Sequence, residues 1–256
     1  MAERVGGPLN LYMFVLHTGL LMSFFIMSGI MQWMLLCIYM KHGHIVYTMI
    51  LFFAALLLLT CIHFSEFLKY GKPWNYIAIL SCYELLTLGV TSFIVDSSAG
   101  AAIGVIMGAI LVWSAILAGC YAIIRFVKYP NPYILGGAGV VGLMISITMV
   151  AVDQVLDSRV CGEIALFIVL LSVITMLVSH VLMTYDSRDV LTKVDTLLVA
   201  FVLYLNYVII MVIIFIFVIR NRRYKYVECT TEVTVKRAIE ATEAVTYFYK
   251  PAWEID

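Results

Sequence analysis

Charged residues are scarce in this chain of 256 residues, in which Asp, Glu, Lys and Arg together make up 12%. That is about half of the share found in an ordinary soluble domain. Lys plus Arg (16) and Asp plus Glu (16) cancel, so the formal net charge is zero. A nucleic-acid-binding protein would need a basic patch, and a disordered regulator would need a far more polar sequence. The composition excludes both classes, and a soluble enzyme with them.

Several chemical motifs are missing as well. No lysine lies inside an apolar run, which excludes a retinal-type Schiff base, and no arginine ladder supports voltage sensing. The sequence contains no P-loop, no Gly-x-Ser-x-Gly and no Gly-x-Gly-Asp motif. The six cysteines form no Cys-x-x-Cys pair and have no zinc-like spacing. We therefore expect no enzyme activity, no cofactor and no resident metal.

Apolar sequence, in contrast, is abundant: 64% of the residues are apolar, against about 45–50% in soluble proteins. Seven runs with few or no charges have the length that spans a bilayer. They cover residues 11–38, 45–66, 74–95, 99–124, 132–152, 163–185 and 197–219. This pattern predicts an all-α integral membrane protein, a seven-transmembrane-helix bundle. It has a short N-terminal segment (1–10), a transmembrane domain (11–219) and a polar C-terminal tail (220–256).

The distribution of Lys and Arg among the loops predicts the orientation of the chain in the membrane. With the N-terminus in the cytosol, seven Lys and Arg residues fall on the cytosolic side and two on the other side before the tail. The start of the tail does not fit this orientation, because seven crossings would place its basic cluster at residues 220–225 on the non-cytosolic side. Either the last run does not fully cross the membrane, or the excess of Lys and Arg in the earlier cytosolic loops decides the orientation despite the tail. We favour seven crossings. No small-residue cleavage site follows a short apolar core, so the first run is expected to be a retained span.

Glycines recur at short helical spacing in the fourth and fifth runs. The fourth run carries one glycine every four residues, at Gly100, Gly104 and Gly108. Those of the fifth run are Gly136, Gly137, Gly139 and Gly142. Small residues on one helix face let two backbones approach closely in lipid. Both faces are therefore predicted to be packing seams, and packing of the fourth run against another subunit stays open.

Glu84 stands alone at the middle of the third run. An ionised carboxylate at that depth costs about 2.5–3.5 kcal/mol or more on insertion scales. The side chain must therefore be protonated, paired with another group or turned toward a water-filled cavity. Glu84 is the first candidate for a functional group, and an interhelical hydrogen bond is the structural alternative.

Four other polar residues lie in or near the last two runs. Asp186 closes the sixth run, where a carboxylate is often only a solvated cap. His180 lies six residues earlier and does not share a helix face closely with it. Asn206 lies well inside the seventh run and suits interhelical hydrogen bonding. Asp195 precedes that run at the membrane interface.

Three short stretches combine aromatic, apolar and acidic or amide residues. They are PWNY (73–76) followed by YELLTLGV (83–90), YDS (185–187) and LYLN (203–206). In order, spacing and seven-run layout, over about residues 10–220, the chain resembles the transmembrane Bax inhibitor motif (Lifeguard) family. The three stretches are similar to that family's third-helix glutamate segment, its Tyr-Asp-Thr signature and its Leu-Tyr-Leu-Asp signature.

The resemblance implies a seven-helix bundle of the Bax inhibitor type around a central helix. It implies a place in the endoplasmic reticulum, the Golgi or related membranes, calcium leak and inhibition of cell death. Ca²⁺ would be the permeant ion, and the lipid bilayer the main partner. In the family, two aspartates share a proton and gate the path according to pH, since two nearby carboxylates cannot both ionise cheaply.

This chain departs from the family at the second aspartate. The first position matches Asp186, but the second is Asn206. An amide can accept or donate a hydrogen bond but removes the like-charge repulsion, so we predict weakened or absent acid gating. Glu84 then remains as the titratable group on the path, with Asp195 and His180 as accessory groups. Herpesviruses and poxviruses encode divergent members of the family, and the altered signature would suit one of them.

Two functions of different classes stay open. The first is a cation leak for calcium, in which Glu84 and Asp186 line or gate the path; oxygen ligands suit calcium. The second is a non-conducting protein that binds or reroutes other membrane proteins, for example host proteins in immune evasion. The missing aspartate and the glycine seams favour the second function.

Overall fold

A computed structural model describes residues 10–40, 43, 45–127, 130–156, 159–188, 190–191 and 195–221. The predicted N-terminal segment and tail lie outside the described residues, apart from Asn10, Arg220 and Asn221. In the described ranges every regular element is a helix. The packing discussed below concerns residues up to Phe215, which belong to one compact unit.

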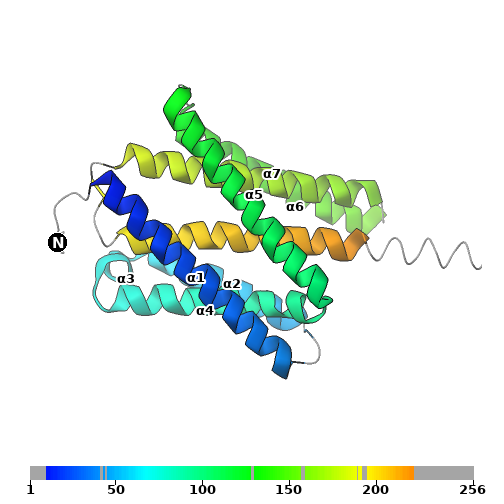
Figure 1. Ribbon diagram of the computed structural model, residues 1–256. Coiled ribbons are helices and arrows are strands. Elements are labelled where there is room, and N and C mark those ends of the chain that lie inside the picture. The colour runs from blue at the N-terminus through cyan, green and yellow to red at the C-terminus, as the bar shows by residue number, and fades with distance from the viewer. Residues whose placement is uncertain are drawn as a thin grey trace, which may run out of the picture. The chain divides into compact units, whose positions relative to one another are not determined.

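Eight helices make up the described chain (Figure 1). They are α1 (Leu11–Tyr39), α2 (Ile45–Phe64), α3 (Glu66–Tyr70), α4 (Trp74–Val95), α5 (Ala99–Phe126), α6 (Pro132–Leu156), α7 (Arg159–Asp186) and a last helix, Asp195–Asn221. Seven of them, all but the short α3, are long and apolar enough to cross a membrane. The predicted fold class is confirmed: the chain is an all-α, multi-pass integral membrane protein.

The second predicted run ends earlier than expected. The sequence predicts a span to residue 66, but α2 ends at Phe64 and a separate short helix follows. Ser65 has extended backbone angles, and the Leu68 backbone N–H donates to its Oγ at 3.4 Å. A serine in this position caps a helix N-terminus, so Ser65 separates α2 from α3.

The central helices are α4 and the first part of the last helix. Helices α1, α2 and α3 all pack against α4, while α6 runs beside α7 (Figure 1). Tyr83 and Val90 of α4, and Tyr204 and Met211 of the last helix, are at most 1% exposed. The outer helices turn large apolar side chains outward, such as Phe24 of α1. Such outward apolar side chains are favourable in lipid.

The glycine seam predicted in the fifth run is confirmed at three positions. A Cβ added at Gly136, Gly139 or Gly142 would lie closer than 3.0 Å to a side-chain atom of α7. Only a bare backbone therefore lets α6 and α7 approach this closely. Gly137 points elsewhere, and an added Cβ there would meet nothing within 4 Å.

The glycines of α5 do not form such a seam inside the described chain. A Cβ added at Gly100, Gly104 or Gly108 would meet nothing within 4 Å in the described residues. Another face of α5 is buried, and its positions are Ala102, Val105, Ala109 and Cys120. No described helix covers this face, so the spacing alone did not show what the three glycines pack against. Packing of this glycine face against another subunit stays open.

Candidate functional site

Glu84 lies at the middle of α4, ten residues after Trp74 and eleven before Val95. It is half-buried, and its Oε1 accepts a hydrogen bond of 2.9 Å from the Gln32 amide nitrogen. Because Gln32 belongs to α1, this bond joins two helices inside the apolar region. Of the three expectations for Glu84, the structure shows pairing, with an amide as the partner.

Gln32 is a site residue that the sequence reasoning missed. Its carbonyl oxygen, Oε1, is buried and has no hydrogen-bond partner. Buried polar atoms are normally satisfied, so an orphaned acceptor beside a carboxylate is unusual. It was detectable in principle, because Gln32 is the one carboxamide within residues 11–38. We call Gln32 and Glu84 the oxygen pair.

A closely packed cluster adjoins the oxygen pair, and we call it the tyrosine cluster: Phe25, Trp33, Tyr83, Thr87 and Tyr204. All five side chains are at most 4% exposed. The Trp33 indole donates to the Thr87 carbonyl at 2.8 Å, and the Tyr83 hydroxyl donates to the Phe25 carbonyl at 3.2 Å. The hydroxyls of Thr87 and Tyr204 are 2.8 Å apart. The cluster therefore satisfies its own polar groups.

The rings of this cluster also stack on one another. The ring centroids of Phe25 and Tyr83 are 5.0 Å apart, and those of Tyr83 and Tyr204 are 5.1 Å apart. These distances lie in the range of favourable aromatic pairs. Aromatic rings from α1, α4 and the last helix thus fill the space next to the oxygen pair.

Asp186 and Asn206 lie at different depths. Asp186 is exposed at the last residue of α7, and Asp195 is half-buried at the first residue of the next helix. Asn206 follows Asp195 by eleven residues, about 16 Å along a helix axis. Its amide nitrogen donates to the Val202 carbonyl of its own helix at 2.8 Å. This hydrogen bond of Asn206 thus stays within its own helix.

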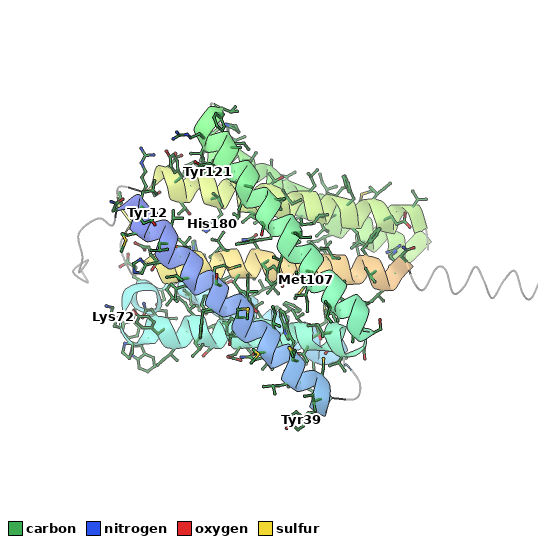
Figure 2. All side chains as sticks on the ribbon, viewed as in Figure 1. Tyr12, Tyr39, Lys72, Met107, Tyr121 and His180 are labelled. Carbon is green, nitrogen blue, oxygen red and sulfur yellow. The ribbon has the colours of Figure 1, made fainter. Side chains whose placement is uncertain are left out.

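His180 lies apart from the oxygen pair, in a cavity of about 770 Å³. Residues of α1, α5, α7 and the last helix line this cavity, and Gln32 and Glu84 do not. In Figure 2 His180 lies in the space between the ribbons of α1 and α5, which both contribute to the lining. The accessory histidine thus belongs to a second site, which the sequence reasoning did not anticipate.

The donor atoms suited to a metal are dispersed. The described residues contain no group of three or more His, Cys, Asp or Glu side chains that could hold a metal ion. The free cysteines include two buried ones, Cys82 and Cys120. Cys82 packs as a core residue and donates weakly to the Ala55 carbonyl at 3.3 Å.

Comparisons with known protein families, with curated proteins and with solved structures found no match. The helices define the class as a multi-pass integral membrane protein, and the described part of the chain holds seven helices long and apolar enough to span a membrane. The likeness to the Bax inhibitor motif family rests on the sequence stretches alone.

Proposed function

We propose that this protein is a cation leak pathway of an intracellular membrane, with calcium as the permeant ion and the oxygen pair as its polar step. The observation that carries the proposal is the placement of Glu84 against Gln32 at the middle of α4. Such a costly group is rarely kept at this depth without a function. The resemblance to the Bax inhibitor motif family supports calcium as the ion and the endoplasmic reticulum or Golgi as the location.

The chemistry of the oxygen pair suits weak and brief cation contact. Hard cations such as Ca²⁺ bind carboxylate and amide oxygens, and a dedicated site needs six to eight of them. Here the Glu84 carboxylate and the unpartnered Gln32 Oε1 supply only a few. These oxygen atoms would replace part of the hydration shell of a passing ion but would be too few to bind it tightly. This favours a slow leak over storage.

A smaller cavity lies next to the oxygen pair on one side. It measures about 300 Å³, and its lining includes Leu36 and Leu88, one helical turn beyond Gln32 and Glu84. The tyrosine cluster fills the bundle at the level of the oxygen pair, where Trp33 and Tyr83 are the sequence neighbours of Gln32 and Glu84. In this proposal the tyrosine cluster is the barrier of a closed state, and separation of α1 from α4 would open it.

Calcium flux into liposomes tests the proposal directly. The full-length protein is reconstituted into vesicles that enclose a calcium indicator, and external Ca²⁺ is added. We expect influx above that of protein-free vesicles, and a reduced rate for Glu84→Gln. Glu66→Gln is the matched control, because Glu66 is exposed on α3. Equal influx with and without the protein would refute the leak.

The second candidate is a non-conducting protein that binds other membrane proteins and reroutes them. The open glycine face of α5 favours it, since exposed Ile103 and Met107 flank glycines that no described helix covers. Membrane proteins that co-purify with the wild type and not with Gly104→Leu, in the absence of calcium flux, would support this function. Host proteins would be the targets if the chain is virus-encoded.

A further inference from the structure

The cavity of about 770 Å³ has the size of a small-molecule site. Its lining follows α1 from Leu11 to Ile26. Fifteen helical steps correspond to about 22 Å, which exceeds one leaflet of a hydrocarbon core about 30 Å thick. Most of the lining side chains are aliphatic or aromatic. The cavity is therefore long and apolar enough for an alkyl chain.

Three buried polar atoms without a hydrogen-bond partner belong to residues that line this cavity. They are Thr18 Oγ1, Trp113 Nε1 and His180 Nε2, which come from α1, α5 and α7. Thr18 is only 6% exposed. An indole N–H can only donate, and a threonine hydroxyl can donate as well. Unsatisfied donors of this kind are costly in an apolar region. A ligand with oxygen acceptors would satisfy them and would therefore be favoured.

One end of the cavity carries a positive charge. The start of α1 at Leu11 and the ends of α5 and α7, at Arg125 and Tyr185, line the same cavity. Arg125 is exposed there, and a guanidinium matches the geometry of carboxylate and phosphate groups. Thr18 follows Leu11 by seven residues, about 10 Å deeper along the helix. His180 precedes Tyr185 by five residues and Trp113 precedes Arg125 by twelve, about 8 Å and about 18 Å along their helices. Thr18 and His180 therefore lie nearer to the cation, and Trp113 lies deeper in the cavity.

We propose that this cavity binds a monoacyl glycerophospholipid with an anionic headgroup. Its phosphate would lie at Arg125, its glycerol hydroxyl and ester oxygens would accept from Thr18, His180 and Trp113, and its acyl chain would follow α1 toward Ile26. The inference does not depend on the cation leak, because Gln32 and Glu84 lie outside this lining.

Gly19 offers a way to fill the cavity without disturbing the fold. It lines the cavity, and a Cβ added there would meet nothing within 4 Å. Leucine also has a better helix propensity than glycine. Gly119→Leu is the matched control, because Gly119 has equally open surroundings and is not part of the lining. A cooperative thermal unfolding transition in both variants is the check that each is folded.

Binding of radiolabelled oleoyl lysophosphatidic acid to the purified full-length protein in detergent tests the proposal. We expect saturable binding that Gly119→Leu retains and Gly19→Leu weakens at least about tenfold, a loss of about 1.4 kcal/mol. No saturable binding to the wild type, or equal binding by the two glycine variants, would overturn the site. Calcium flux measured on the same preparations reports separately on the leak.

Competing lipids identify the headgroup. Lysophosphatidic acid should displace the label better than lysophosphatidylcholine, oleate or mono-oleoylglycerol. Arg125→Gln should weaken the binding of lysophosphatidic acid and leave the binding of mono-oleoylglycerol unchanged. Thr18→Val should weaken the binding of both lipids. Thr60→Val is its control, because the Thr60 hydroxyl donates to the Leu56 carbonyl on α2, and it should weaken the binding of neither lipid. Stronger competition by oleate would assign the cavity to fatty acids and overturn the glycerophospholipid.

Discussion

Gln32 and Glu84 are 52 positions apart in the chain and are joined by one hydrogen bond of 2.9 Å between α1 and α4. Replacing Gln32 by leucine removes the donor and leaves the Glu84 carboxyl without this partner in an apolar region. A buried polar group that loses its partner costs about 1–3 kcal/mol. We expect Gln32→Leu to lower the free energy of unfolding by that amount, measured by thermal or denaturant unfolding in detergent.

The double replacement isolates the interaction. Gln32→Leu combined with Glu84→Leu removes both polar groups, so it should be more stable than Gln32→Leu alone. Glu84→Gln keeps an acceptor for the Gln32 amide and should cost little. If Gln32→Leu were as stable as the wild type, the hydrogen bond would contribute nothing to the fold.

Gly29 of α1 packs against Tyr204, Tyr83 and Thr87 of the tyrosine cluster. A Cβ added there would lie 3.1 Å from the Tyr204 hydroxyl and 3.6 Å from the Tyr83 hydroxyl. A larger side chain must therefore displace hydroxyls that take part in the buried network, and overpacking of this kind costs about 1–3 kcal/mol. Gly29→Val should lower the melting temperature, as followed by intrinsic fluorescence. Gly119→Val is the control, and equal melting temperatures for the two would contradict the close approach.

The apolar runs predicted the spanning helices because length and lack of charge decide insertion into a bilayer. Glu84 could be found in the same way, since a carboxylate inside a run is conspicuous. The pairing of Gln32 with Glu84 could not be found, because the two residues are 52 positions apart and no local pattern joins them. The cavity was also beyond prediction, since Thr18, Trp113 and His180 are ordinary residues until three helices bring them to one space.

The glycines of α6 provide a prediction with an internal control. Gly142 faces the Ser172 hydroxyl of α7 at a distance that leaves no room for a Cβ, whereas an added Cβ at Gly137 would meet nothing within 4 Å. Gly142→Leu should force α6 and α7 apart and reduce the yield of folded protein in size-exclusion chromatography. Gly137→Leu should elute like the wild type. Similar profiles for the two variants would show that the α6–α7 seam tolerates side chains.

Asn206→Asp tests whether a carboxylate at this position can control the leak. The Asn206 amide nitrogen donates to the Val202 carbonyl at 2.8 Å. A protonated carboxyl at position 206 can still donate to that carbonyl, but an ionised one cannot and is repelled by it. The variant should therefore resemble the closed wild type in acidic buffer and leak faster as the pH rises and the carboxyl ionises. Calcium influx into liposomes in slightly acidic and slightly alkaline buffers measures this difference. Asn75→Asp, a carboxylate at the start of α4, controls for added negative charge. If the calcium flux through Asn206→Asp does not vary with pH, position 206 does not lie on the ion path.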